Sequence, residues 1–146
     1  TSLTVAAWVK IDAATRGPGW VAAQGDNYGL VVNRYHPGDV CFYFFDGKDW
    51  PDVTSDDVDI LDGRWHHLAG VLDRAARRMY VYKDGLRVAA LPTMGAVRYK
   101  HGIGFTIGSM QGGRFFHGTI DDVRVYDHAL SQQEMERIAM MNRKQQ

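Results

Sequence analysis

The chain has 146 residues, the length of one compact domain with a single hydrophobic core. Its 17 basic residues balance 17 acidic ones, so no overall positive charge directs it to nucleic acid or to an anionic membrane surface. The single cysteine, Cys41, excludes an intrachain disulfide and a cysteine-rich zinc site, and no apolar run approaches the ~18 residues of a transmembrane helix. We therefore expect one domain over residues 1–146, with no nucleic-acid partner and no membrane insertion.

Patterns typical of short β-strands begin at the N-terminus. Residues 3–11, LTVAAWVKI, alternate so that one face carries Leu3, Val5, Ala7, Val9 and Ile11. Further apolar or alternating stretches, separated by turn-forming residues, follow at 19–24, 28–35, 40–45, 64–73, 78–91, 104–109 and 118–126. About eight short strands with turns between them indicate an all-β sandwich or barrel rather than alternating strands and helices.

Turn chemistry is clearest at Asp84-Gly85, which lies between two alternating runs. These residue types supply the positive φ angles of a tight β-hairpin turn. The stretch from 46 to 63 combines Pro, Gly and Ser with many Asp residues. It is therefore expected to be mostly loop, with a short strand at residues 58–61, VDIL.

One helix is expected at the C-terminus, over about residues 131–142. Ser131 can act as its N-cap, and Glu134 completes a capping box three residues later. Leu130 can pack across the cap against Met135. An apolar stripe at helical spacing, formed by Met135, Ile138 and Ala139, is expected to contact the core.

Five segments carry a resemblance to a known family. They are LTVAAWVK (3–10), DGRWHHLAGVLD (62–73), RMYVYKDGLRVAAL (78–91), FTIGS (105–109) and FFHGTIDDVRVYDHALSQQEM (115–135). In this order they resemble the laminin-G-like, concanavalin-A-like lectin–glucanase jelly-roll family, especially its bacterial and pentraxin-related branch. The resemblance implies two antiparallel sheets packed face to face and agrees with the strand count. The predicted fold is therefore all-β, a two-sheet antiparallel jelly-roll sandwich with one short C-terminal helix.

The same resemblance implies a function. Members of the family are typically noncatalytic modules that bind glycans or proteins, often with calcium, in secreted or cell-surface multidomain proteins. The family usually has an additional strand before the segment matched at residues 3–10, which can supply calcium ligands and pair with the terminal strand. This chain begins without that segment, so the domain is expected to lack the usual first strand.

A glycoside hydrolase is the enzymatic alternative. Jelly-roll glucanases use two carboxylates about 5–5.5 Å apart, carried as Glu residues that alternate along one strand face. Both glutamates of this chain, Glu134 and Glu136, fall on the predicted helix. Asp121 and Asp122 are neighbours on a predicted strand and are expected to project to opposite faces. No catalytic residue is therefore predicted.

A cation site is expected at the aspartate pair. Calcium takes about six to eight oxygen ligands, many of them from Asp, and by motif match to the family Asp121 is the first candidate ligand and Asp122 the second. The alternative is that one of these carboxylates pairs with Arg124 or a loop amide, and both interpretations stay open. His66 and His67 should point to opposite sides of their strand, so we expect them to pack and hydrogen-bond within the sandwich rather than bind one metal.

Glycan binding requires exposed aromatic rings, on which sugar C–H faces pack, and polar groups for the hydroxyls. Side chains of this kind near predicted turns are the candidate ligand-binding residues: Trp50, Tyr35, His36, Tyr28, Trp20 and Tyr99. Trp50 is the foremost candidate, because Pro51 and its acidic neighbours make it difficult to bury the ring on both sides. The alternative for each ring is a role as a loop anchor.

These observations predict a noncatalytic recognition module from a larger multidomain protein, binding carbohydrate with possible assistance from Ca²⁺. Its partner would be a glycan, either a polysaccharide or a glycoconjugate. The first alternative is a protein–protein adhesion or structural module that contacts a protein surface, and the second is a glycoside hydrolase. The resemblance alone implies an extracellular or cell-surface location.

Overall fold

The computed structural model describes residues 1–141 of the chain. Over this range the chain forms short strands and one helix in the order β1 (Leu3–Ile11), β2 (Gly19–Ala23), β3 (Tyr28–Val32), β4 (Val40–Phe44), β5 (Asp52–Thr54), β6 (Trp65–Asp73), β7 (Arg78–Lys83), β8 (Leu86–Pro92), β9 (Thr106–Ile107), β10 (Gly118–Tyr126) and α1 (Gln132–Met140). No helix among the described residues combines the length and apolar character needed to cross a membrane.

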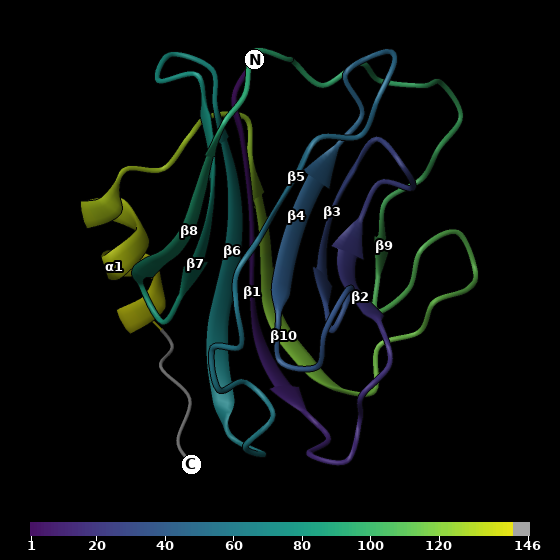
Figure 1. Ribbon diagram of the computed structural model, residues 1–146, viewed down its shortest axis with the longest axis vertical. Coiled ribbons are helices and arrows are strands. Elements are labelled where there is room, and N and C mark those ends of the chain that lie inside the picture. Colours follow the sequence, from purple (N-terminus) through teal and green to yellow (C-terminus); the bar gives the residue numbers. More distant parts are fainter. Residues whose placement is uncertain (142–146) are drawn as a thin grey trace.

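The strands form two antiparallel sheets that pack face to face (Figure 1). Sheet A has the order β10-β1-β6-β7-β8, and sheet B has the order β5-β4-β3-β2-β9. Neighbouring strands that are far apart in the sequence, such as β1 and β10, make the topology of a jelly roll rather than of a simple meander. The predicted two-sheet antiparallel jelly-roll sandwich is confirmed.

The main core lies between the sheets and follows the alternation of the strands. In β1 the predicted inward face is confirmed, because its five apolar residues all belong to the central buried cluster. Leu68 and Leu72 of β6 contribute from the same sheet, and Phe42 and Phe44 of β4 contribute from the other. The alternation visible in the sequence thus determines which half of each strand enters the core.

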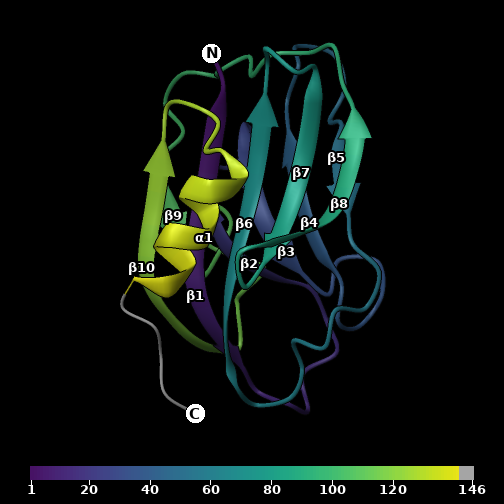
Figure 2. The ribbon, with the colours of Figure 1, turned by 90° about the vertical axis from the view of Figure 1, so that its left-hand side faces the viewer.

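Helix α1 packs on the outer face of sheet A, in front of β1 and β6 in Figure 2. Its capping box is present: Ser131 Oγ accepts from the Glu134 backbone N–H at 3.1 Å, and the Ser131 N–H donates to Glu134 Oε1 at 3.0 Å. The predicted apolar stripe is buried beneath the helix together with Leu130. The helix begins one residue later than predicted, and position 142, the predicted end, lies outside the described residues.

The predicted β7–β8 hairpin is confirmed. Asp84 and Gly85 have φ angles of 50° and 82°, which is the left-handed pair that a two-residue hairpin turn needs. A side chain at position 85 would also bring its Cβ to 3.3 Å from Glu136 Cα of the helix. Glycine therefore allows both the turn and the close approach of α1.

One strand was placed wrongly by the sequence pattern. Residues 58–61 form no strand, and the short strand in this region is β5, where Val53 pairs with Phe42 of β4. Asp59 adopts a φ of 58°, which interrupts an extended run. Ile60 is fully buried in the core instead, and the partly buried Val58 and Leu61 pack against the same cluster. The segment is therefore anchored by side-chain packing rather than by strand pairing.

Strand β10 also departs from the simple alternation expected for the aspartate pair. Trp8 pairs with Asp121 and Ala6 pairs with Arg124, so two residues of β10 lie opposite one residue of β1. This β-bulge places Asp122 at a φ of 51° and turns its carboxylate to Arg124, on the outer face of sheet A. The expectation that Asp121 and Asp122 project to opposite faces is therefore wrong, because a bulge removes the two-residue period.

Candidate functional site

The outer face of sheet B, on the side of the sandwich away from α1 (Figure 1), carries a shallow pocket of about 170 Å³. We call it the sheet-B pocket. It draws its residues from two strands and four connecting segments: Trp20, Asp26, Arg34, Tyr43, Trp50, Met110 and Arg114. The sheet supplies a rigid base, and the loops supply charged and aromatic side chains around it.

Two buried rings, Trp20 and Tyr43, form the aromatic floor of this pocket. Trp20 Nε1 donates to the Tyr43 hydroxyl at 3.0 Å, and that hydroxyl donates to the Gly25 carbonyl at 2.7 Å. Burial raises the pKa of Tyr43 to about 12, so its hydroxyl stays neutral. A side chain at Gly29 would place Cβ 2.5 Å from the Tyr43 hydroxyl oxygen, and glycine there makes room for the floor.

Two arginines lie over the aromatic floor. The guanidinium carbon of Arg114 is 4.8 Å from the centre of the Trp20 ring, and that of Arg34 is 5.8 Å from it. Arg34 also lies 5.1 Å from the Tyr43 ring and 5.4 Å from the Tyr35 ring. Among the described residues, no carboxylate forms an ion pair with either guanidinium. Stacking therefore positions both cations while their N–H groups stay available.

The carboxylate beside Tyr35, that of Asp52, is already engaged. The Tyr35 hydroxyl donates to Asp52, and this hydrogen bond, with burial, raises the pKa of Tyr35 to about 12. The Cys41 thiol lies 3.8 Å from the same carboxylate, and burial raises the pKa of Cys41 to about 12. Cys41 is therefore an uncharged residue of the sheet rather than a reactive thiol.

Trp50 lines the sheet-B pocket and is 45% exposed. Its Nε1 donates to the Asp26 carbonyl at 3.0 Å, and its ring centre is 4.8 Å from that of Phe45. Lys100 lies over both rings and forms an ion pair with the Asp26 carboxylate at 2.6 Å. One side of Trp50 is thus anchored, and the remainder of the ring is open to a ligand.

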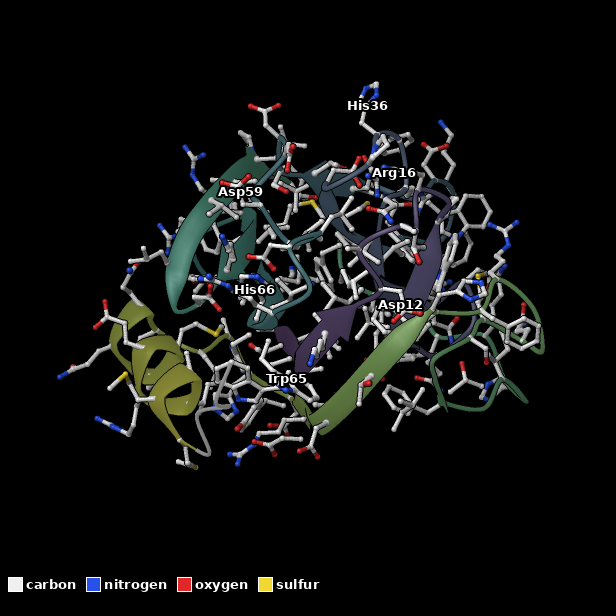
Figure 3. The ribbon with its side chains drawn as sticks, turned by 90° about the horizontal axis from the view of Figure 1, so that it is seen from below. Asp12, Arg16, His36, Asp59, Trp65 and His66 are labelled. Carbon is white, nitrogen blue, oxygen red and sulfur yellow. The ribbon has the colours of Figure 1, made fainter. Side chains whose placement is uncertain are left out.

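The sequence-predicted ligand residues are divided among different places. Trp20 and Trp50 line the sheet-B pocket, although Trp20 is only 3% exposed, and Tyr35 borders it through Arg34. Tyr28 and Tyr99 line a separate pocket of about 430 Å³ beside the N-terminus. His36 lies in an exposed loop and points away from the body of the protein (Figure 3). The structure therefore brings together three of the six.

Sequence reasoning missed five residues of the site: Asp26, Arg34, Tyr43, Met110 and Arg114. Tyr43 alternates with the inward-facing Phe42 and Phe44 on β4 and reads as a strand residue like any other. Each arginine directly precedes an exposed aromatic residue in the sequence, which is a weak signal. Only the pairing of β2, β3 and β4 shows that they share one face.

The predicted metal ligands lie on the other sheet. The Asp122 carboxylate forms an ion pair with Arg124 Nε at 3.0 Å, and its backbone N–H donates to Asp121 Oδ1 at 2.8 Å. Pairing with Arg124, one of the two interpretations left open, is therefore present. Within residues 1–141 no group of three His, Cys, Asp or Glu side chains is arranged to hold a metal ion. As placed, the aspartate pair does not supply the oxygen-rich set that calcium needs, and calcium binding stays a prediction.

The lower end of the sandwich, seen in Figure 3, carries an acidic pocket of about 300 Å³. Its lining residues are Arg16, Pro37, Asp57, Asp59, Leu61 and Asp62. None of them is aromatic, so this pocket offers no ring on which a sugar could stack. Among the pockets described above, only the sheet-B pocket combines an exposed aromatic ring with arginine side chains that have no carboxylate partner among the described residues.

Comparisons with known proteins agree with this fold. Residues 1–136 match the family described as the concanavalin A-like lectin/glucanases superfamily. A search of the curated proteins gave no significant match.

Three solved structures illustrate the likeness of fold. A candidate carbohydrate-binding protein from Bacteroides ovatus ATCC 8483 has a TM-score of 0.76 at 20% identity, covering 93% of this chain and 40% of that one. The heptameric SAP-like pentraxin of Limulus polyphemus has a TM-score of 0.70 at 19% identity, covering 97% of this chain and 70% of that one. The CBM40 module of the Ruminococcus gnavus IT-sialidase has a TM-score of 0.74 at 16% identity, covering 94% and 82%. This chain thus spans two fifths of the length of the Bacteroides protein.

Proposed function

We propose that this chain, which belongs to the concanavalin A-like lectin/glucanases superfamily, is a noncatalytic carbohydrate-binding module whose ligand occupies the sheet-B pocket. The observation that carries the proposal is the convergence of the exposed Trp50 ring with Arg34 and Arg114 over one aromatic floor. Two of the similar structures are named for carbohydrate binding, which supports the same class of ligand.

Binding in this pocket would be reversible and would need no chemical step. The C–H face of a sugar packs on the open part of Trp50, because aromatic faces attract such weakly polar surfaces. The N–H groups of Arg34 and Arg114 donate to oxygens of the sugar. The sheet holds Trp20 and Tyr43 in place before the ligand arrives, so little ordering is needed on binding.

The arrangement of carboxylates supports a binding role over hydrolysis. A retaining glycosidase needs two carboxyl groups about 5–5.5 Å apart across the scissile bond. The carboxylate that lines the sheet-B pocket, Asp26, is held by Lys100, and the neighbouring Asp52 accepts from Tyr35. Both glutamates lie on α1, on the far side of sheet A.

The setting of the module rests on the family resemblance. In this proposal the chain is part of a larger extracellular or cell-surface protein, and calcium assists binding from a site outside the sheet-B pocket. A glycan screen run with calcium and with a chelator tests whether calcium assists binding. Equal binding in both conditions would remove calcium from the proposal.

Protein adhesion is a second candidate function. It is favoured by β8, an edge strand of sheet A on which Leu86 and Leu91 are 61% and 45% exposed. An exposed strand edge with apolar side chains can pair with another chain. A complete absence of glycan binding in the screen would favour this alternative.

The first prediction distinguishes the sheet-B pocket from the one beside the N-terminus. On any glycan that the parent protein binds, Trp50→Ala is expected to weaken affinity about tenfold or more, because the sugar loses its stacking surface. The melting temperature should change little, because the ring is half exposed. Isothermal titration calorimetry measures the affinity.

Tyr99→Ala is the matched control, since Tyr99 is 52% exposed and lines the other pocket. Its affinity is expected to equal that of the parent. If Tyr99→Ala weakens binding and Trp50→Ala does not, the ligand lies beside the N-terminus and the assignment to sheet B is wrong.

A further inference from the structure

The described arginines differ in what occupies their N–H groups. Arg124 has the carboxylate of Asp122, Arg87 donates to the Tyr82 hydroxyl, and Arg16 donates to the carbonyls of Ala13 and Thr15. The guanidinium groups of Arg34 and Arg114 have no side-chain or carbonyl acceptor among the described residues, yet both are held over the same Trp20 ring. Two cations on one ring without a counter-ion repel each other, and a bound anion removes that cost.

Hydrogen-bond acceptors around the sheet-B pocket, by contrast, are either engaged or buried. Asp26 Oδ2 is paired with Lys100, and Asp26 Oδ1 has no hydrogen-bond partner among the described residues but is buried. Asp52 accepts from Tyr35, and the Tyr43 hydroxyl accepts from Trp20. A neutral sugar presents hydroxyl groups that must donate as well as accept. An anionic oxygen group only accepts, so it matches a pocket that is rich in donors and poor in acceptors.

We infer that the sugar held in the sheet-B pocket carries an anionic oxygen group, a carboxylate or a sulfate ester, that binds between Arg34 and Arg114; this inference rests on the proposed function. The planar guanidinium donates two parallel N–H groups to such a group, which makes a charge-assisted pair stronger than a neutral hydrogen bond. The pocket volume of about 170 Å³ is below the roughly 300–1,000 Å³ that encloses a drug-sized ligand. One charged sugar unit therefore occupies it, with the rest of the glycan outside.

The test compares sugars that differ only in charge, using the full chain and isothermal titration calorimetry. Lactose is compared with lactose that carries a terminal sialic acid and with lactose that carries a sulfate ester. An oligoglucuronate is compared with its carboxyl-reduced, neutral counterpart. At least one anionic sugar is expected to bind about tenfold or more tightly than its neutral partner, with affinity falling as salt rises. Whether the carboxylate sugars or the sulfated sugar bind more tightly identifies the carboxylate or the sulfate as the recognised group.

Variants assign that charge preference to the two arginines. Arg34→Gln and Arg114→Gln are each expected to weaken binding of the anionic sugar about tenfold and to weaken binding of its neutral partner much less, because the neutral partner loses only a neutral hydrogen bond. Arg34→Lys keeps the charge but loses the planar fork, so an intermediate affinity is expected. The control is Arg74→Gln, which removes an exposed arginine from the β6–β7 turn of sheet A and should bind like the parent. Thermal melting of each variant checks that it is folded.

Two outcomes overturn the inference in different ways. If neutral sugars bind as tightly as their anionic partners, or if Arg34→Gln and Arg114→Gln behave like Arg74→Gln, the anionic preference is wrong while carbohydrate binding stands. If no sugar of either kind binds the parent protein, the proposed function fails together with the inference.

Discussion

Two adjacent histidines show how strongly the local environment separates similar residues. His66 Nδ1 lies 3.0 Å from an oxygen of Asp84, and its Nε2 lies 2.8 Å from one of Asp62. Burial lowers the pKa of His66, but the hydrogen bonds and charges of these two carboxylates outweigh burial and raise it. His67 packs edge-on against Trp8 at 5.4 Å, and burial lowers its pKa to about 4. The alternation of side chains along β6 predicted that His66 and His67 point to opposite faces of the sheet. The contact between His66 and Asp84 could not be predicted from the sequence, because it forms only in the folded protein.

The raised pKa of His66 predicts a pH-dependent contribution to stability. Protonated His66 stabilises the folded state, and this contribution is fully present below the ordinary pKa of about 6.5 and is lost as pH rises through the higher folded-state pKa. His66→Asn should therefore lower the free energy of unfolding more at about pH 6 than at about pH 8.5. Urea denaturation at the two pH values measures the difference.

The control for that experiment is His36→Asn, which changes an exposed histidine (Figure 3). Its effect on the free energy of unfolding should be small at both pH values. An equal loss of stability for His66→Asn at both pH values would contradict a protonated bridge between Asp62 and Asp84.

At the scale of secondary-structure elements, the helix and the hairpin that are specified by neighbouring residues in the sequence were predicted well. The capping box of α1 and the Asp84-Gly85 turn are each built by residues only a few positions apart, so their chemistry is visible in the sequence. Strand β5 and the bulge in β10 were not predicted. Both depend on a partner strand distant along the chain, β4 in one case and β1 in the other.

The capping box gives a prediction for α1. Ser131→Ala removes the acceptor of the Glu134 backbone N–H and is expected to lower the free energy of unfolding by about 1 kcal/mol. Ser131→Asp keeps a capping oxygen and should retain most of the parent's stability. Chemical denaturation of the three proteins measures this order. If Ser131→Asp loses as much stability as Ser131→Ala, the cap is not the cause.

At the scale of the whole molecule, the two sheets interlock at a position that has no side chain. Gly70 lies in β6 of sheet A, and a Cβ there would be 2.3 Å from Cδ1 of Phe42 in sheet B. Phe42 is fully buried. The absence of a side chain at position 70 therefore lets the Phe42 ring of β4 fit against the opposite sheet.

Gly70→Ala is expected to lower the free energy of unfolding by about 1–3 kcal/mol, because the added methyl group overpacks the core. Gly104→Ala is the matched control, since a Cβ at position 104 would have no neighbour within 4 Å in the part of the chain that the structure describes. It should be nearly neutral. Equal stability of the two variants, measured by denaturation, would mean that Phe42 moves aside at little cost.

The sequence by itself determined the all-β class, the inward face of β1, the hairpin turn and the capped helix. These depend on residue spacing and on chemistry within one turn or one strand, which the linear order preserves. The candidate site was only partly visible. Trp50, Trp20 and Tyr35 could be chosen as aromatic residues near turns, whereas Tyr28, Tyr99 and His36 met the same criterion and lie elsewhere.

Only the tertiary structure decided that Arg34 and Arg114 share the Trp20 ring and have no carboxylate partner within residues 1–141. They come from different loops, and their meeting depends on the pairing of β3 with β2 and on the path of the chain after β9. Charge balance over the whole chain concealed this, because a net charge of zero says nothing about which cations are left unpaired. The physical reason is that an ion pair is a matter of distance in space, which strand pairing sets and sequence separation does not.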